Sequence, residues 1–421
     1  MSEGMYAQNI LIGTVVIALI IGAGIGYGTT QFTADDEDST AVSGKLKAGF
    51  IYVGPIGDLG WTNAHDNARV ALDEKYDWLE TNFLESVAVA DTITSIEFLI
   101  EDWGADVIFT TSFDYMANTI LAGERWPDTI FFHISGFMRS ANVGTLFADF
   151  YQLYYLNGLM AGALTQTNQL GYVGSFEIPE LVRHIDAFHL GAMAVNPDVT
   201  THVRWISSWY DPGLATAAAT ELLDPGIGAD ILAFTEDSES VLQAASAAGA
   251  AGFSHYSPMQ ELVPDATISG QLVHWDVIYE DALQKVFLGD YTNKNLANVD
   301  VLGLLKEGAV ELGGAFDVPI NPLFVDDLKA VNVTDALLGG SDGTLSVYEL
   351  VMTRLAQMSE VNVGFEPFTG PIYDTDGNLV VKSDARMSIF ELMTMEWFVG
   401  VDGGCAAVSN VGCVFSPGTS T

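Results

Sequence analysis

Residues 170–207 read LGYVGSFEIPELVRHIDAFHLGAMAVNPDVTTHVRWIS, and the apolar residues in them follow three successive patterns. A short apolar run predicts a strand over 170–175, a longer amphipathic segment predicts a helix over 180–195, and a second apolar run predicts a strand over 202–207. Strand, helix and strand in this order are typical of a βαβ unit, in which the helix connects two parallel strands.

The same alternation continues on both sides of this unit. Two consecutive series of strands and helices, each too short for one large sheet, predict an α/β protein with two lobes of similar design. The earlier series has strands over 47–53, 106–111, 129–135 and 143–148 and helices over 61–78 and 151–165, and the later one adds a helix over 214–223, a strand over 229–234 and a helix over 238–248.

The N-terminal part of the chain predicts a membrane anchor. Residues 9–28 (NILIGTVVIALIIGAGIGYG) carry no charge, and twenty helical residues span a hydrocarbon core of about 30 Å. The acidic run 35–38 (DDED) and the composition beyond it favour a single-pass cell-membrane protein with its body on the extracellular side. A cleaved signal peptide is the alternative, but the leader MSEGMYAQ has no basic residue and the apolar run is longer than a typical h-region.

The charge balance excludes one class of function. The 421 residues include 55 Asp plus Glu and only 15 Lys plus Arg, a formal net charge of −40. Such a surface repels nucleic acid, so we expect no nucleic-acid partner. Charged residues make up only 17% of the chain, so the imbalance reflects a shortage of basic residues rather than an unusually large number of acidic ones.

The same imbalance predicts a protein adapted to a salty habitat, because salt screens the repulsion among surface carboxylates. We expect the free energy of unfolding to rise from dilute buffer to concentrated salt. Denaturant titrations at several salt concentrations measure this, and equal stability at all of them would contradict the prediction.

The only two cysteines, Cys405 and Cys413, lie in the last seventeen residues. Outside a membrane they are expected to form a disulfide. A zinc site would need two further ligands, and the tail contains no His. His184 and His189 are five residues apart and do not share a helix face, so no metal site is predicted there either.

Aromatic and small polar residues follow one predicted strand after another. Because the carboxyl ends of parallel strands meet at one edge of a sheet, these residues are expected to surround a ligand there. Rings beside hydrogen-bonding groups suit a flat, neutral ligand, although aromatic residues that merely anchor loops are an equal alternative. The strand ends are GPIGDLGWT (54–62), TSFD (111–114), SGF (135–137), GSF (174–176) and WISSWYD (205–211).

At these same residues the chain resembles the basic membrane protein family, the substrate-binding components of ABC transporters related to purine nucleoside receptor lipoproteins. The resemblance extends over about residues 45–402 and implies a type I periplasmic-binding-protein fold, with two doubly wound parallel-sheet lobes joined by a hinge. It also implies a purine base or nucleoside as ligand, an ABC permease and ATPase as partners, and neither a cofactor nor enzymatic activity. The matching blocks are YVGPIGDLGWTNAHDNAR (52–69), VIFTTSFDYM (107–116), residues 154–198, WISSWYDPGLATAAATELLD (205–224), FTGPIYDTDG (368–377) and MTMEWFVG (393–400).

Together these patterns predict a five-part organisation. The parts are an N-terminal transmembrane anchor (1–29), an acidic linker (30–44), lobe 1 (45–150, with about 272–295 returning to it), lobe 2 (151–271, with about 296–402 completing it and the hinge) and a Cys-containing tail (403–421).

The resemblance also implies the ligand-binding residues. Asp58 is expected to accept hydrogen bonds from ring or amino N–H groups, Trp61 to stack on the base, and Trp275 to close the pocket where the chain recrosses the hinge. A surface ion pair is the alternative role for Glu180 with Arg183, and Asp211-Pro212 is better explained as a helix start. The full predicted set is Asp58, Trp61, Thr62, Phe113, Asp114, Phe176, Glu180, Arg183, Trp209, Trp275 and Asp276.

The chain departs from the family in two places. Pro258 stands where many members have a carboxylate that helps to hold the sugar, which favours a free base such as adenine unless His255 or Asp276 substitutes. Asp186 replaces an Asn and is expected to add a charge near the edge of the second lobe.

Two other classes of function compete with a transport receptor. A sensory or surface-layer ectodomain would use the same fold without a transporter. An enzyme ranks third, because the chain has no H-E-x-x-H motif and no phosphate-binding loop of the G-x-x-x-x-G-K type.

Overall fold

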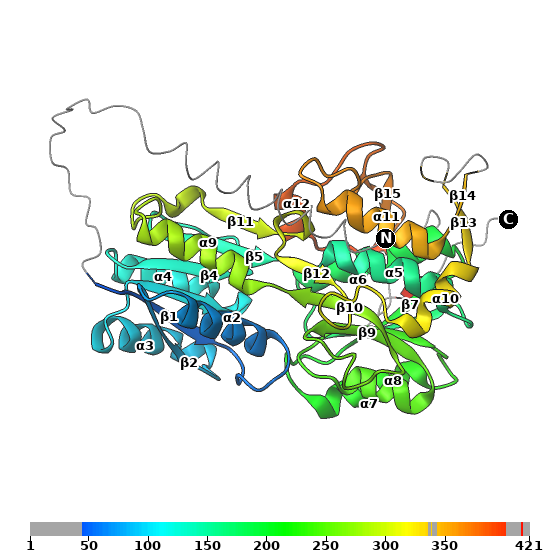
Figure 1. The fold of residues 1–421 in the computed structure, drawn as a ribbon, viewed down its shortest axis with the longest axis horizontal. Coiled ribbons are helices and arrows are strands. Elements are labelled where there is room, and N and C mark those ends of the chain that lie inside the picture. Colours follow the sequence, from blue (N-terminus) through cyan, green and yellow to red (C-terminus); the bar gives the residue numbers. More distant parts are fainter. Residues whose placement is uncertain (1–43, 336–337, 339–342, 401–413, 416–421) are drawn as a thin grey trace, which may run out of the picture. The chain divides into compact units, whose positions relative to one another are not determined.

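The computed structural model describes residues 44–335, 338, 343–400 and 414–415, all of which belong to one compact unit, residues 41–421. The predicted anchor, nearly all of the acidic linker and both cysteines lie outside the described residues. Within them, no helix has the length and apolarity that crossing a membrane requires. Two parallel sheets organise this unit (Figure 1).

The first sheet has six strands in the order β11-β5-β4-β3-β1-β2, and every neighbouring pair is parallel. The strands are β1 (Leu46–Tyr52), β2 (Leu79–Leu84), β3 (Val107–Thr111), β4 (Ile130–Ile134), β5 (Val143–Ala148) and β11 (Asp300–Gly303). The helices around it are α2 (Trp61–Lys75), α3 (Thr92–Glu97), α4 (Met116–Arg125) and α9 (Trp275–Phe287).

Alternating side chains bury both faces of this sheet. In β3, Val107 and Phe109 join the core under α2 and α9, whereas Ile108 between them joins the core under α3 and α4. The continuous apolar run of β3 is explained by this two-sided burial, because a strand covered on both faces has no solvent-facing positions.

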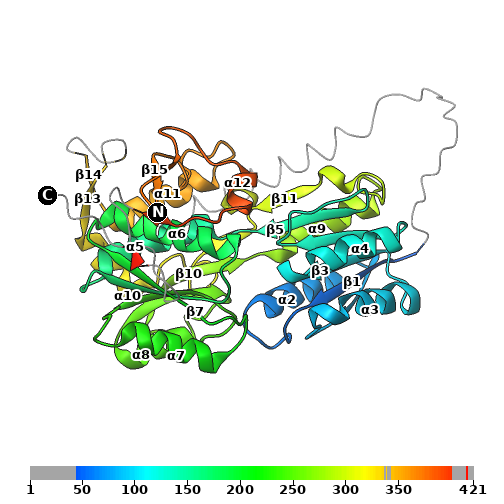
Figure 2. The ribbon, with the colours of Figure 1, turned by 180° about the vertical axis from the view of Figure 1, so that it is seen from behind.

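The second sheet has seven strands in the order β12-β10-β9-β8-β6-β7-β18. Helices α5 and α6 cover one of its faces and α7 and α8 the other (Figures 1 and 2). The inner strands are parallel, and the edge strands β12 and β18 are antiparallel to their neighbours. The strands are β6 (Gln169–Gly174), β7 (Thr200–Trp205), β8 (Ile231–Thr235), β9 (Ala251–Tyr256), β10 (Thr267–Val273), β12 (Val310–Leu312) and β18 (Val414–Phe415); the helices are α5 (Tyr151–Leu164), α6 (Pro179–Val195), α7 (Pro212–Leu223) and α8 (Ser240–Ala248).

Within the described residues the chain passes between the two sheets at three places: from β5 to α5, from β10 to α9 and from β11 to β12. The segment that returns to the first lobe is longer than predicted. It continues past residue 295, because β11 pairs in parallel with β5. The strand was overlooked because only four residues, 300–303, form it, and their sequence DVLG lacks a clear strand pattern.

The remaining elements cover the second lobe near its α5–α6 face. Here β15 and β16 form a hairpin, and at its turn Asp374 Oδ1 accepts the N–H groups of Asp376 and Asn378 at 3.0 and 2.8 Å. The elements are α10 (Pro322–Ala330), β13 (Asn332–Thr334), β14 (Thr344–Ser346), α11 (Val347–Ser359), β15 (Ile372–Asp374), β16 (Leu379–Val381), α12 (Ile389–Met393) and β17 (Val399–Gly400).

The predicted fold class is confirmed: two lobes, each with a doubly wound parallel sheet, joined by several crossing segments. The predicted helix start at Asp211 is also confirmed, since its Oδ1 accepts the N–H of Leu214 at 2.9 Å and Pro212 begins α7.

Candidate ligand-binding site

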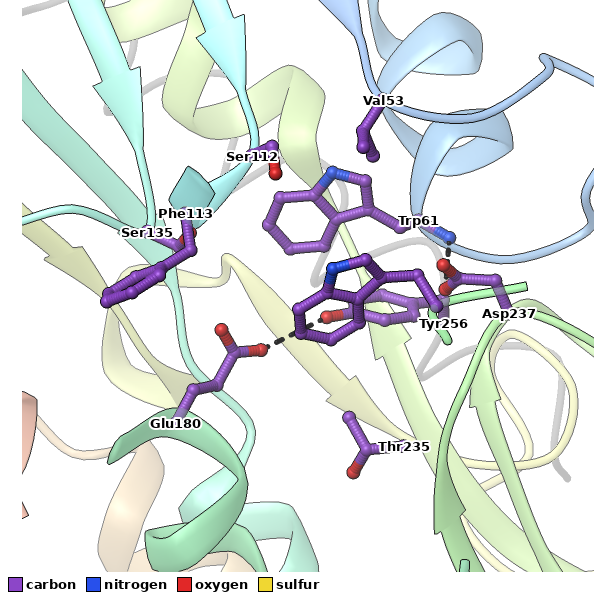
Figure 3. A pocket seen from close by; sticks show the side chains of 10 residues that line it. Val53, Trp61, Ser112, Phe113, Ser135, Glu180, Thr235, Asp237 and Tyr256 are labelled. Carbon is purple, nitrogen blue, oxygen red and sulfur yellow. Dashed lines mark hydrogen bonds between the residues drawn. The ribbon is translucent and has the colours of Figure 1, made fainter. Parts of the chain in front are cut away.

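A pocket with about 370 Å³ of empty volume lies between residues of the two lobes (Figure 3). The residues that line it are Val53, Trp61, Ser112, Phe113 and Ser135 from the first lobe, and Glu180, Trp209, Thr235, Asp237 and Tyr256 from the second.

Most of these residues stand at the carboxyl ends of parallel strands, where ligands bind in open α/β sheets. Two of them have left-handed backbones: Ser135, which follows β4, has φ 66°, and Tyr256, the last residue of β9, has φ 61°. Non-glycine residues rarely adopt this conformation, and such strain concentrates at functional sites. The strand ends therefore turn sharply to present these side chains to the pocket.

Trp61, the first residue of α2, is one of two tryptophans in the pocket wall and is 8% exposed. Its indole Nε1 donates to the carbonyl oxygen of Thr111 at 2.8 Å, which attaches the ring to the end of β3. Edge-on contacts with His65, Tyr256 and Trp275, at ring-centroid distances of 4.4, 5.5 and 5.7 Å, hold it from the other sides. The ring is thus pre-oriented before a ligand arrives.

Trp275 is buried behind Trp61 and does not line the pocket, so the prediction that it closes the pocket is wrong. It begins α9, directly after the chain recrosses from β10 as predicted, and its ring lies 4.2 Å from His65 and 5.7 Å from Tyr279. The Tyr279 Oη and His65 Nδ1 are 2.6 Å apart, and burial holds the pKa of His65 well below its ordinary value. These neutral rings support Trp61.

Asp58 and Thr62 shape the loop before α2 and do not line the pocket. Asp58 accepts the backbone N–H groups of Gly60, Thr62 and Asn63, and the Thr62 hydroxyl accepts the N–H of Gly54 at 3.2 Å. Asp58 was predicted to accept hydrogen bonds from the ligand. The structure instead commits both of its oxygens to the backbone.

The charged groups of the pocket are all acidic. Burial raises the pKa of Glu180 to about 7, and the Tyr256 hydroxyl lies 3.5 Å from Glu180 Oε1. Burial also raises the pKa of Asp237 well above its ordinary value, with nearby Asp58 and Glu180 adding to the rise. Since no Lys or Arg is among the lining residues, the pocket favours ligands that donate hydrogen bonds and carry no negative charge.

Glu180 makes ligand affinity depend on pH. If the ligand donates a hydrogen to the Glu180 carboxylate, its affinity should rise about tenfold from pH 6 to pH 8, because the ionised fraction rises by that factor around a pKa of about 7. Glu180→Gln should remove the dependence in calorimetric titrations across this range. Glu236→Gln is the matched control, because Glu236 is buried outside the pocket lining and its pKa is about 9. An unchanged pH profile in Glu180→Gln would contradict the assignment.

The raised pKa of Glu180 affects the stability of the protein in the opposite direction, so that higher pH favours ligand binding but lowers stability. The folded pKa of Glu180, about 7, exceeds the ordinary value of 4.5, so the folded protein binds the proton more tightly. Its contribution to the stability of the unliganded protein is therefore complete below about pH 4.5 and is lost as the pH rises through 7.

Arg183 lies in a buried ionic cluster rather than in the pocket lining or on the surface. Its Nε donates to Asp149 Oδ2 at 2.5 Å, and His184 Nε2 lies 2.9 Å from Asp149 Oδ1. Burial alone would raise the pKa of Asp149, but Arg183 and His184 hold it below its ordinary value. Because Asp149 stands between β5 and α5, this cluster reinforces a crossing between the lobes, and the surface-pair alternative for Glu180 and Arg183 is wrong.

Four of the eleven predicted site residues line the pocket together: Trp61, Phe113, Glu180 and Trp209. Phe176 does not line it but packs against Trp209 with ring centroids 5.1 Å apart. Asp114, in the short helical turn Phe113–Tyr115, is exposed. Asp276 lines a second hollow, together with Leu59, Pro258 and Phe316.

Asp237 and Tyr256 are pocket residues that the sequence reasoning missed. Both follow the rule used for the others, because Asp237 comes two residues after β8 and Tyr256 ends β9. The letters FTEDS at 234–238 and SHYS at 254–257 therefore contained the signal.

The residues singled out as departures from the family do not lie in the pocket. Pro258 and Asp276 line the second hollow, and His255 is buried with its Nδ1 3.0 Å from the Tyr154 hydroxyl. Asp186 is fully buried and its Oδ1 accepts the N–H of Val399 at 3.0 Å, so the prediction of a charge at the edge of the lobe is wrong. Burial raises the pKa of Asp186 well above its ordinary value.

Comparisons with known proteins agree with this architecture. The family model for PnrA-like ABC transporter substrate-binding proteins (Bmp) matches residues 45–332. A purine-binding protein of Brucella abortus is 35% identical over 364 residues, which cover 85% of this chain and 93% of that protein.

Two further comparisons match part of the chain. A Haloferax volcanii protein provisionally named an ABC transporter glucose-binding protein is 37% identical over 270 residues, 63% of this chain and 68% of that protein. The solved structure of an ABC transporter solute-binding protein from Aeropyrum pernix superposes with a TM-score of 0.57 at 18% identity, covering 64% of this chain and 76% of that one. The latter likeness concerns the fold alone.

Proposed function

Because the chain belongs to the PnrA-like family of ABC transporter substrate-binding proteins, we propose that its pocket captures a purine base or nucleoside and presents it to a membrane permease. The pocket chemistry supports this ligand class. A preset indole, Trp61, offers a surface for stacking, and Glu180 and Asp237 offer hydrogen-bonding groups to ring and amino N–H atoms. The observation that carries the proposal is this combination of a fixed indole with carboxyl groups and no cation.

The lack of a basic residue in the lining also indicates what the pocket rejects. A nucleotide would bring a phosphate next to Glu180 and Asp237, and no lining side chain would neutralise it. The proposed ligand is therefore a base or nucleoside without phosphate.

A sugar is the second candidate ligand, favoured by the similarity to the Haloferax volcanii protein. Carboxyl groups that accept from hydroxyls, beside an aromatic ring, also suit a sugar. A nucleoside contains both kinds of group, whereas a free base and glucose each contain one, so the three are separable by direct binding.

The cellular setting is part of the same proposal. The apolar segment 9–28 would hold the body on the extracellular side of the cell membrane, close to the permease and ATPase of an ABC importer. An anchor of this kind keeps a captured ligand near its transporter.

Sensory, surface-layer and enzymatic roles rank below transport. The letters G-x-S-x-G do occur at 339–343 (GGSDG), but the flanking elements are the antiparallel strands β13 and β14. A nucleophile elbow requires a strand followed by a helix, so this occurrence does not support a hydrolase. We propose that the protein is not an enzyme.

Calorimetric titration of the full-length chain in mild detergent and high salt tests the ligand. Adenine, adenosine, guanosine, inosine and glucose are titrated in parallel. Heat with a purine compound and none with glucose would support the proposal, whereas heat with glucose alone would replace it by the sugar alternative. No heat with any of them would overturn the proposed ligand class.

A further inference from the structure

The N-terminus of α2 meets the second lobe at the pocket. Gly60 occupies the N-cap position and has no side chain to cap the helix. Asp58 from the preceding loop accepts three of the N–H groups of residues 60–63, at 2.9, 3.0 and 2.9 Å. The remaining group, the N–H of Trp61, donates to Oδ1 of Asp237 at 3.0 Å. Asp237 belongs to the second lobe, so one lobe completes the helix cap of the other (Figure 3).

The absence of a side chain at residue 60 makes this approach possible. A Cβ atom at Gly60 would lie 2.6 Å from the Cα, Cβ and Oδ1 atoms of Asp237, closer than real Cβ contacts allow. Gly57, in the same loop, faces open space, and a Cβ there would meet nothing within 4 Å. A side chain at residue 60 would therefore meet the other lobe, whereas one at residue 57 would not.

The second oxygen of the same carboxyl is free for a ligand. Asp237 lines the pocket and is 4% exposed, and its Oδ2 has no hydrogen-bond partner among the described residues. Because Asp237 lines the pocket, a ligand bound there can supply the hydrogen bond that this oxygen lacks. One carboxyl thus faces the first lobe with one oxygen and the ligand space with the other.

We propose that Asp237 is the positioning residue that couples ligand capture to closure of the lobes, with Oδ1 holding the Trp61 amide and Oδ2 hydrogen-bonding the ligand. The proposal rests on the pocket being the capture site. A ligand that engages Oδ2 holds the carboxyl in the orientation that Oδ1 needs, and the positive end of the α2 dipole favours a carboxyl there. A single hydrogen bond adds only modestly to closure, so the lobes remain able to reopen and release the ligand.

Lobe-to-lobe distances measure this coupling directly. Spin labels are placed on the exposed positions Leu121 in the first lobe and Leu214 in the second, in the full-length chain with both native cysteines replaced by Ser. Distances are recorded without ligand and with adenosine, and adenosine affinity is measured by calorimetry. Gly60→Ala should shift the distances to longer values and weaken adenosine binding about tenfold or more, while Gly57→Ala should match the parent protein.

Two substitutions of Asp237 complete the test. Asp237→Ala should behave like Gly60→Ala. Asp237→Asn should retain the short label-to-label distance of the closed lobes, because its amide oxygen still accepts the N–H of Trp61. The coupling would be overturned if the label-to-label distances in Gly60→Ala equalled those in the parent protein. It would also be overturned if the parent protein never showed the short distance of closed lobes, with or without adenosine. If adenosine gives no heat with the parent protein, the proposed ligand fails, but the unliganded distances of parent and Gly60→Ala still decide the coupling.

Discussion

Trp61→Ala should weaken binding of the purine ligand at least about thirtyfold, because the substitution removes a buried indole from the pocket wall. Buried aromatic residues at the centre of a binding site commonly contribute 2 kcal/mol or more, which corresponds to about this factor. Calorimetric titration with the best purine ligand measures the loss. Binding equal to that of the parent protein would contradict the stacking role of Trp61.

Two controls separate the loss of stacking from the loss of structure. Trp61→Phe keeps a ring but removes the hydrogen bond to the Thr111 carbonyl, and should cost less affinity than Trp61→Ala. Trp126→Ala removes a tryptophan of the same lobe that donates a hydrogen bond to Glu101 and does not line the pocket. The affinity of this variant for the purine ligand should therefore equal that of the parent protein. Thermal unfolding of all three variants shows whether the lobe remains folded.

Arg183→Leu should lower the free energy of unfolding by about 3–5 kcal/mol, the cost of leaving a buried charge without its partner. Arg183 and Asp149 are 1% and 0% exposed, and the substitution would leave the Asp149 carboxyl with only His184 and the Tyr151 N–H as partners. Denaturant titration of the parent and variant in the same salt measures the difference.

Arg139→Leu is the matched control for this prediction. Arg139 also contacts a carboxylate at short distance, Asp300 at 2.7 Å, but these side chains are 27% and 39% exposed. An exposed pair contributes about 0–1 kcal/mol, so this variant should be nearly as stable as the parent. A loss in Arg183→Leu no larger than that in Arg139→Leu would show that the buried cluster has no special structural role.

Local sequence patterns determined most of the fold. The predicted helix over 180–195 and the strand over 143–148 agree with α6 and β5 within one residue, because periodicity and apolar runs are properties of neighbouring residues. The short strand β11 was missed for the complementary reason. Four residues form too little pattern to be distinguished from a loop, and only pairing with β5 makes them a strand.

The sequence also located the site at the level of strand ends. Trp61, Phe113 and Trp209 were predicted from aromatic residues just beyond strands, and all three line the pocket because parallel strands bring their carboxyl ends to one edge. That rule depends only on chain direction within a sheet, so it is readable without coordinates.

The contacts of each polar group depend instead on how distant parts of the chain pack together. Asp58 and Asp237 are both carboxylates near strand ends. Asp58 accepts backbone N–H groups from its own loop and the start of α2, whereas Asp237 accepts the N–H of Trp61, 176 residues away in the chain. Likewise, the burial of Arg183 with Asp149 depends on how α6 packs on a crossing segment. Hydrogen bonds and desolvation act over a few ångströms in space, so partners far apart in sequence are determined by the packing of the two lobes and not by local pattern.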